Sequence, residues 1–183
     1  IVLGYCNAGR VIQVGSDVEG LEVGDRVVSN GPHAEIVSVP KNLVAKIPEE
    51  VDYEEAVFTI LASVSLQGIR LADPKIGEVV GVIGLGLVGL LAVKLLRANG
   101  CQVIAMDFDV DRLTHAQQLG AIAINLSIEG AESICHKFTS GMGLDSVLIA
   151  ASTESNDPLT LSSKLTRKGG KIVLIGVSGM EMS

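Results

Sequence analysis

Residues 81–92 read GVIGLGLVGLLA, and this stretch decides the fold. Its four glycines stand among aliphatic side chains only, after the apolar segment VVGVI and before a segment with helical spacing. The apolar run extends from Val79 to Val93 before Lys94 and Arg97 interrupt it, which is too short to cross a bilayer. We interpret the stretch as the end of a strand, a glycine-rich turn and the beginning of a helix.

The rest of residues 51–183 alternates helical segments with compact apolar runs. The pattern predicts helices at 53–72, 86–99, 109–119, 129–140 and 155–166, and strands at 79–83, 102–106, 121–124, 145–149 and 171–175. Continuous apolar strands are buried on both faces, which is typical of a parallel sheet covered by helices. The sequence therefore predicts an α/β fold with a Rossmann-type, doubly wound parallel sheet.

Residues 1–50 have a different pattern, in which short runs rich in valine and isoleucine are separated by glycines. This pattern predicts an all-β segment. The change occurs near Pro48, where the acidic sequence EEVDYEE predicts a helix start. We expect two domains, at residues 1–50 and 51–183.

The composition argues against proteins that bind nucleic acid and against secreted proteins. Of the 183 residues, 48% are hydrophobic and 19% are charged, and the net charge of −7 without a basic block argues against a nucleic-acid surface. Cys6, Cys101 and Cys135 form no CxxC pair, which favours reduced thiols in the cytoplasm, and the first residues do not resemble a signal peptide. We expect a cytoplasmic protein that binds neither nucleic acid nor membrane.

The glycine motif has the spacing of a dinucleotide-binding turn, Gly84-x-Gly86-x-x-Gly89, between a strand and a helix. In such a turn the first glycine permits the tight bend, the second lets the backbone approach a pyrophosphate, and the third lets the helix pack on the strand. The N–H groups at the helix start then face the phosphates. The predicted turn consists of Gly84, Leu85, Gly86, Leu87, Val88 and Gly89.

Asp107 follows Gly84 by 23 residues and ends the next predicted strand, where a carboxylate accepts hydrogen bonds from the adenosine ribose. We assign Phe108 and Arg112 to the same site. The alternative is a glycine-rich turn that serves packing alone, with Asp107 as the cap of the next helix. A 2′-phosphate would meet this carboxylate and its acidic neighbours with only Arg112 nearby, so the sequence favours NAD over NADP.

Residues 8–28, AGRVIQVGSDVEGLEVGDRVV, resemble the VxxVGxxVxGxxxGDRV signature of the medium-chain dehydrogenase/reductase superfamily. AEIVSVP at 34–40 is similar to a strand of that family, and RKGGKIVLIG at 167–176 also fits it. The resemblance implies that residues 1–50 are part of a GroES-like β-barrel preceding the Rossmann domain. It further implies hydride transfer between a nicotinamide cofactor and an alcohol or carbonyl compound. Against this family the chain looks like an internal fragment, truncated at the C-terminal end of the Rossmann domain.

Zinc-dependent members of this family carry GHE where this sequence has Gly4-Tyr5-Cys6, and no Cys, Asp or His lies near Thr59, the position of another ligand. Their four-cysteine lobe is also missing, because residues 29–33 lead directly into the next predicted strand. We therefore expect no zinc. Cys6 and His33 supply only two ligands for any metal, and a packed thiol with a loop histidine is the simpler interpretation.

At finer grain, GYCNAG, SNGPHAE, VPKNLVAKIPE and LQGIRLADPKIGE are similar to the N-terminal half of bacterial bi-domain oxidoreductases. This resemblance implies a second, fused oxidoreductase domain of the glucose-fructose oxidoreductase type. It also implies a small-molecule substrate, with sugars and sugar nucleotides as one class. The superfamily often forms homodimers by joining nucleotide-domain sheets edge to edge, so a homodimer is a further expectation.

The resemblance assigns further residues at the ends of strands. Ala151 and Ser152 match the loop that lies over the adenosine, and Gly176 and Val177 match the backbone next to the nicotinamide. For Ser152 and the adjacent Thr153, capping of the helix at 155–166 is an equal alternative.

Without zinc, a hydroxyl, an imidazole or a group of the substrate must move the proton that accompanies hydride transfer. Ser63, His33 and Tyr5 are the candidates, with packing as the alternative role for Ser63. The resulting hypothesis is a zinc-independent, NAD-preferring alcohol or carbonyl oxidoreductase. A quinone or enone reductase and a non-catalytic NAD(H)-binding module are the alternatives.

Overall fold

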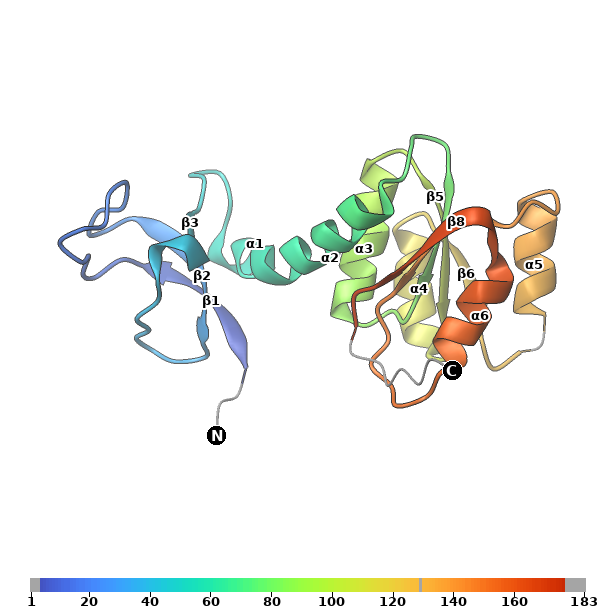
Figure 1. Cartoon of the computed structure of the whole chain (residues 1–183). Helices are drawn as coiled ribbons and strands as arrows, with labels where there is room; N and C mark the ends of the chain where they lie inside the picture. The colour runs from blue at the N-terminus through green and yellow to red at the C-terminus, as the bar shows by residue number, and fades with distance from the viewer. Residues whose placement is uncertain (1–3, 129, 177–183) are drawn as a thin grey trace. The chain divides into compact units, whose positions relative to one another are not determined.

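The computed structural model describes residues 4–128 and 130–176, and the chain divides into two compact units, Ile1–Ser63 and Val64–Ser183 (Figure 1). The division falls within helix α2 (Thr59–Ala72), which belongs to both units. The domain boundary expected after residue 50 stays a prediction.

The first unit is built on an antiparallel sheet of three strands in the order β1-β2-β3. Its elements are β1 (Tyr5–Arg10), β2 (Arg26–Pro32), the 3-10 helix η1 (Lys41–Leu43), β3 (Val44–Lys46) and α1 (Tyr53–Ala56). Val28, Ile47 and Ala56 form its small buried core. The Arg26 guanidinium lies 4.7 Å from the centre of the Tyr53 ring and donates a 2.6 Å hydrogen bond to the Val51 carbonyl, which ties the sheet to α1.

Two expectations for this unit are wrong. Residues 34–40 form no strand, because no neighbouring segment of the described chain pairs with them, and Ile36 is 69% exposed. The helix predicted over 53–72 is interrupted between α1 and α2. There the Phe58 N–H bonds to the Glu55 carbonyl three residues back, which tightens the chain, and the Ala62 N–H bonds to the Phe58 carbonyl as α2 begins.

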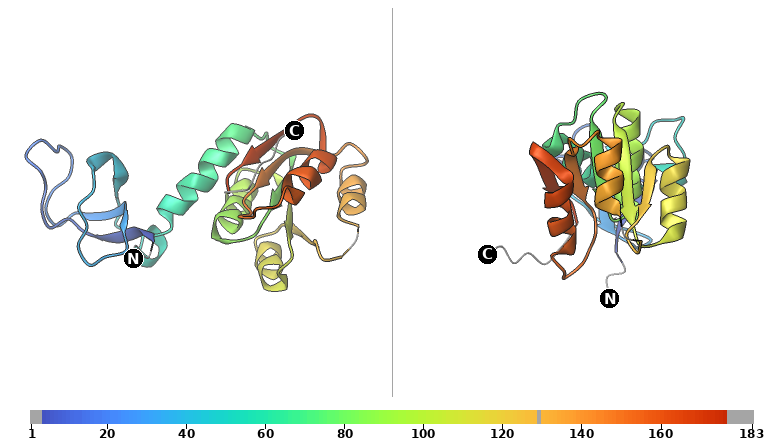
Figure 2. Two further views of the ribbon diagram at one scale, coloured as in Figure 1. Left: turned by 60° about the horizontal axis from the view of Figure 1, so that its bottom comes forward. Right: turned by 90° about the vertical axis from the view of Figure 1, so that its right-hand side faces the viewer.

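The second unit contains a five-stranded parallel sheet in the order β6-β5-β4-β7-β8 (Figure 2). The strands are β4 (Val79–Ile83), β5 (Gln102–Asp107), β6 (Ile122–Asn125), β7 (Leu144–Ile149) and β8 (Thr166–Leu174). The helices that follow α2 are α3 (Leu87–Ala98), α4 (Val110–Gln118), α5 (Ala131–Phe138) and α6 (Asp157–Leu165). The strand order reverses between β4 and β7, which confirms the predicted doubly wound α/β fold.

Two apolar cores cover the two faces of this sheet, as the continuous apolar strands predict. On one face, side chains such as Val82 pack with Val93 and Leu96 of α3 and with residues of α2 and α4. On the other face, Ile104 and Leu144 pack with residues of α5 and α6. Helices on both faces leave the carboxyl ends of the strands as the place where loops meet.

The last strand differs from the prediction of 171–175, because β8 already begins at Thr166. Its register against β7 shifts between the pairs Leu144↔Thr166 and Ser146↔Lys171. Gly169 and Gly170 lie in the irregular part of the strand, where Gly169 has a φ of +76°. No helix within residues 4–128 and 130–176 combines the length and apolar character needed to cross a bilayer.

Candidate functional site

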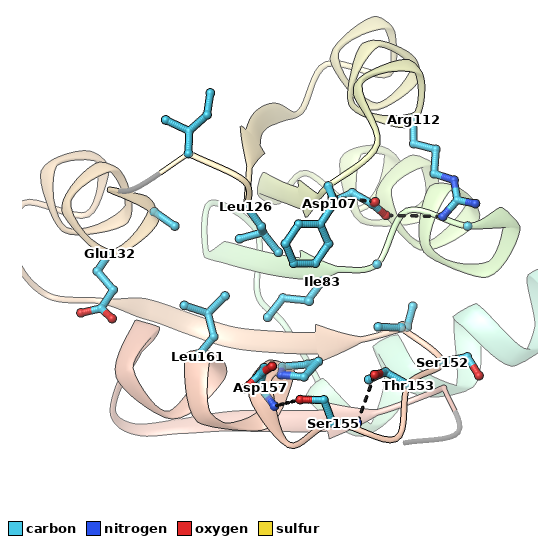
Figure 3. Close-up of a pocket in the computed structure, with 18 of the residues that line it drawn as sticks. Ile83, Asp107, Arg112, Leu126, Glu132, Ser152, Thr153, Ser155, Asp157 and Leu161 are labelled. Atoms are coloured by element: carbon cyan, nitrogen blue, oxygen red, sulfur yellow. Dashed lines mark hydrogen bonds and ion pairs between the residues drawn. The ribbon is translucent and has the colours of Figure 1, made fainter. Parts of the chain in front are cut away.

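A cavity of about 910 Å³ lies at the carboxyl ends of the strands of the second unit (Figure 3). Its walls come from the loops that follow β4, β5, β6 and β7, together with the start of α6. The lining residues are Ile83, Gly84, Gly86, Asp107, Phe108, Arg112, Leu126, Ile128, Gly130, Ala131, Glu132, Ala150, Ala151, Ser152, Thr153, Ser155, Asp157, Pro158 and Leu161. This is the edge of a doubly wound sheet at which nucleotide ligands bind.

The glycine-rich turn forms one side of the cavity, and two of its glycines are required by close contacts. Gly84 has a φ of +90°, and a Cβ there would lie 2.5 Å from the backbone nitrogen of Ala151. A Cβ on Gly89, in the first turn of α3, would lie 1.9 Å from the Gly84 carbonyl oxygen. These contacts hold the turn against the β7–α6 loop and α3 against the turn.

Gly86 is different, because a Cβ there would have no atom within 4 Å. Its φ of −65° is open to any residue, so neither packing nor backbone conformation requires a glycine. Gly86 precedes the first residue of α3 and provides no side-chain cap for the N–H groups of that helix. Open space above uncapped N–H groups fits a pyrophosphate, which the positive end of the helix dipole attracts.

Asp107 lies at the end of β5 and is only 8% exposed. Its Oδ2 accepts a 2.6 Å hydrogen bond from the N–H of Leu85, inside the glycine-rich turn. Its Oδ1 accepts hydrogen bonds from the N–H groups of Phe108 at 2.7 Å and Asp109 at 3.0 Å. Asp107 therefore fixes the turn relative to β5 and places a buried carboxylate in the wall of the cavity.

Asp107 does not cap the next helix, so the alternative expectation that it serves as the cap is wrong. The cap of α4 is Asp109, whose side chain accepts hydrogen bonds from the N–H groups of Asp111 and Arg112. Arg112 projects from α4 towards Asp107, and its Nη1 lies 3.8 Å from the Asp107 Oδ2 (Figure 3). The arginine side chain is half exposed, so this ion pair is weak.

The β7–α6 loop forms the opposite side of the cavity, and its hydroxyl groups order the loop itself. Thr153 Oγ1 accepts a hydrogen bond from the Ser155 N–H, and Ser155 Oγ accepts one from the Asp157 N–H (Figure 3). The N-cap residue of α6 is Asn156. The expected alternative of helix capping by Ser152 or Thr153 is therefore wrong, because both residues precede the helix by too many positions.

Some of the other predicted cofactor residues line the cavity and some do not. Phe108, Arg112, Ala151 and Ser152 line the cavity together with Gly84, Gly86 and Asp107. Leu85, Leu87, Val88, Gly89 and Gly176 do not line it. Leu85 is buried in the core, and the Val88 carbonyl accepts a hydrogen bond from Ser65. A Cβ on Gly176 would lie 2.2 Å from the Ala151 carbonyl oxygen, so packing explains this glycine, and Val177 lies outside the described residues.

The three catalytic candidates lie in the first unit. The Nε2 of His33 lies 2.7 Å from the backbone carbonyl oxygen of Tyr5, so this nitrogen carries a proton and donates to that carbonyl. The Tyr5 side chain is 51% exposed. Ser63 is exposed, and its hydroxyl donates to the Ile60 carbonyl within α2. The structure thus pairs His33 with the backbone of Tyr5.

The donor side chains of the described residues do not form a metal site. Within residues 4–128 and 130–176, no three His, Cys, Asp or Glu side chains are grouped so that they could hold a metal ion. Cys6 is buried, and burial raises the pKa of its thiol, which disfavours the thiolate that zinc needs. The described residues therefore do not fit zinc, while the absence of zinc from the whole protein stays a prediction.

Several cavity residues were not predicted from the sequence. Leu126, Ile128 and Leu161 form an apolar part of the wall, and Glu132 lies near them at the start of α5. Leu126 and Ile128 directly follow β6, and apolar residues in a loop at the carboxyl end of a strand were the available signal. Leu161 carried no such signal, because its position in α6 matches an ordinary core residue.

Comparison with known proteins places the chain among dehydrogenases. Residues 88–183 match the family described as zinc-binding dehydrogenase. The (R,R)-butanediol dehydrogenase of Bacillus subtilis (strain 168) is 30% identical over 155 residues, which cover 69% of this chain and 45% of that enzyme. The solved alcohol dehydrogenase TADH from Thermus sp. ATN1 is 28% identical with a TM-score of 0.91, and the match covers 98% of this chain and 63% of that chain.

A quinone oxidoreductase from Pseudomonas syringae pv. Tomato DC3000 is 25% identical with a TM-score of 0.79, over 93% of this chain and 54% of that chain. The chain thus spans between 45% and 63% of the length of these relatives. The family match covers more than half of the chain. The chain belongs to the zinc-binding dehydrogenase family, within the medium-chain dehydrogenase/reductase superfamily.

Proposed function

We propose that the protein of which this chain is part transfers a hydride between NAD and an alcohol or carbonyl compound, without zinc. The observation that carries the proposal is the buried carboxylate of Asp107, hydrogen-bonded to the turn beside the open space above Gly86. The family membership supports an oxidoreductase that uses a nicotinamide cofactor. Once bound, the nicotinamide supplies the hydride chemistry itself.

The residues of this chain would bind and orient the cofactor. The N–H groups at the start of α3 would hold the pyrophosphate, and the remaining acceptor position of Asp107 would accept a hydrogen bond from a hydroxyl of the adenosine ribose. The adenine would then lie in the cavity between Phe108 and the β7–α6 loop, where apolar side chains such as Leu126 provide its surroundings. Three backbone N–H groups already hold the Asp107 side chain in place, so cofactor binding loses little conformational entropy at this residue.

The preference for NAD over NADP rests on charge. A 2′-phosphate would come close to Asp107, which is buried, and to Asp109, whose carboxylate is half exposed. Two negative charges brought together away from water repel strongly, whereas ribose hydroxyls donate hydrogen bonds to the same oxygens. Arg112 is the cation closest to both carboxylates among the ion pairs of this wall.

The proton that accompanies hydride transfer would pass through a side chain of the first unit. His33 is the strongest candidate, because its Nε2–H is fixed on the Tyr5 carbonyl and the imidazole is the side chain suited to proton transfer near neutral pH. The Tyr5 hydroxyl and the Ser63 hydroxyl are the further candidates. For substrate class we propose small alcohols and carbonyl compounds, with sugar derivatives as the subclass to test first.

Two alternatives each have an observation in their favour. The similarity to the Pseudomonas syringae quinone oxidoreductase favours reduction of quinones or enones. The lack of a grouped set of metal ligands in the described residues favours a module that binds NAD(H) without catalysis. The three free, buried cysteines are consistent with our proposal of a cytoplasmic protein, and a fused oxidoreductase domain and a homodimer remain parts of the same proposal.

A panel assay on the full-length protein separates these possibilities. A dehydrogenase reduces NAD when offered polyols, sugars and butanediols, and this is the expected result. Oxidation of NADPH with quinones or enones would instead identify the reductase. Binding of NADH without turnover of any panel member would identify the non-catalytic module.

A further inference from the structure

The carboxylate of Asp107 has almost no spare capacity to accept hydrogen bonds. Its two oxygens offer about four acceptor positions. Three are used by the N–H groups of Leu85, Phe108 and Asp109, and the remaining one, on Oδ2, faces the Arg112 guanidinium at 3.8 Å. Arg112 therefore lies beside the oxygen of Asp107 that has an acceptor position left for a ligand.

A second carboxylate lies beside the same guanidinium. The Nε of Arg112 lies 3.7 Å from Oδ2 of Asp109, three residues earlier in the chain. The other oxygen of Asp109 is fixed, because Oδ1 accepts hydrogen bonds from the N–H groups of Asp111 at 2.9 Å and Arg112 at 3.2 Å. The helix cap thus holds the carboxylate of Asp109 in one orientation, with its free oxygen directed at Arg112.

We propose that Asp109 is a specificity-determining positioning residue, which disfavours NADP by pairing with the Arg112 guanidinium. This inference rests on the proposed cofactor site. A guanidinium that was free to turn would present a fork of donors to a 2′-phosphate, the arrangement that favours such anions. With Asp109 beside its Nε and Asp107 beside its Nη1, the guanidinium lies between two carboxylates, and a phosphate that approached it would meet both of them.

The proposal differs from simple charge repulsion in one measurable way. If Asp109 acts through Arg112, then removing its charge helps NADPH only when Arg112 is present. If Asp109 only repels phosphate, the same substitution helps NADPH whether or not Arg112 is present. A double-mutant cycle on the two residues measures this coupling directly.

The test is a calorimetric titration of the full-length protein with NADH and NADPH, for the wild type, Asp109→Asn, Arg112→Gln and the double variant. Asparagine has the same shape and is as good a helix cap, so folding is preserved, and Asp109→Ser is a second variant that also caps. Asp111→Asn is the matched control, because Asp111 is a neighbouring carboxylate in the first turn of the same helix. The quantity compared is the ratio of Kd for NADPH to Kd for NADH.

We expect Asp109→Asn to lower this ratio about tenfold, the effect of about one added charge-assisted contact with the phosphate. In the Arg112→Gln background the same substitution should change the ratio less than about twofold, and so should Asp111→Asn alone. The inference is overturned by an unchanged ratio in Asp109→Asn, by an effect that persists without Arg112, or by an equal effect in the control. Failure of the wild type to bind either cofactor, or tighter binding of NADPH, would instead refute the proposed function itself.

Discussion

The substitution Gly86→Ala should abolish tight cofactor binding without unfolding the protein. Alanine is compatible with the φ of −65° at this position, and the added Cβ has no atom within 4 Å. We therefore expect the free energy of unfolding to change by less than about 1 kcal/mol. A pyrophosphate that contacts the backbone would collide with the new methyl group, which should weaken NADH binding by about 1–3 kcal/mol, or roughly 10- to 100-fold.

Two neighbouring glycines provide matched controls, since the structure gives them a different role. Gly84→Ala places a Cβ 2.5 Å from the Ala151 nitrogen at a φ of +90°. The left-handed conformation costs about 1–2 kcal/mol and the overlap adds about 1–3 kcal/mol, so this variant should lose about 2–5 kcal/mol of stability. Gly89→Ala would gain about 1 kcal/mol of helix propensity, yet its Cβ would lie 1.9 Å from the Gly84 carbonyl, so we expect a net loss.

The assay combines two measurements on the full-length protein. Urea unfolding followed by circular dichroism measures stability, because this chain has no tryptophan to report unfolding by fluorescence. Calorimetric titration with NADH measures binding. If Gly86→Ala binds NADH as tightly as the wild type, no pyrophosphate lies above Gly86 and the reasoning is wrong. If Gly86→Ala unfolds as readily as Gly84→Ala, the claim that a Cβ at position 86 meets no other atom is wrong.

Further predictions concern the stability of the second unit. Burial raises the pKa of the Cys135 thiol from 9.0 to about 11, so the folded protein disfavours the thiolate. The stability that Cys135 contributes should be constant below about pH 9 and fall by up to about 1.4 kcal/mol per pH unit as the pH rises from 9 towards 11. In urea unfolding measured across this pH range, the Cys135→Ala variant should lack this part of the pH dependence. The same burial should keep Cys135 unreactive towards a thiol reagent at pH 8 until urea unfolds the protein, and fast labelling of the native protein would contradict this. Asp145→Asn should lower the free energy of unfolding by about 1–2 kcal/mol in the same assay. The Asp145 carboxylate accepts hydrogen bonds from the Val79 N–H at 2.8 Å and from Arg167 at 2.7 Å. A change below about 0.3 kcal/mol would show that these contacts contribute little.

The Rossmann unit could be predicted from the sequence because each of its features is local. The strand ending at Ile83, the turn at Gly84 and the carboxylate at Asp107 follow one another in a short segment, and their order fixes where they meet in the fold. The hydrogen bond from the Leu85 N–H to the Asp107 carboxylate joins the turn to the end of β5, as this spacing predicts. Strand β8 was predicted too short, because its apolar run begins only after Lys171 and the pairing with β7 shows that the strand starts earlier.

The parts that were not predicted depend on contacts between distant segments. The sequence from 34 to 40 alternates as a strand should, but strand formation also requires a partner, and none pairs with it in the described chain. The cavity wall at Leu161 is formed by a helix more than fifty residues from Asp107, and nothing local distinguishes this leucine from a core residue. The role of Asp109 likewise emerges only when the cap geometry and the position of Arg112 are seen together.

The central claim is that the cavity beside Asp107 binds NAD, and a titration of the full-length protein tests it most directly. Calorimetry with NADH and NADPH, on the wild type and on Asp107→Ala, compares the two cofactors at the same site. The account predicts that the wild type binds NADH more tightly than NADPH, and that Asp107→Ala loses this preference together with most of its affinity for NADH. Equal binding of NADH by the wild type and Asp107→Ala, or no binding by the wild type, would contradict it.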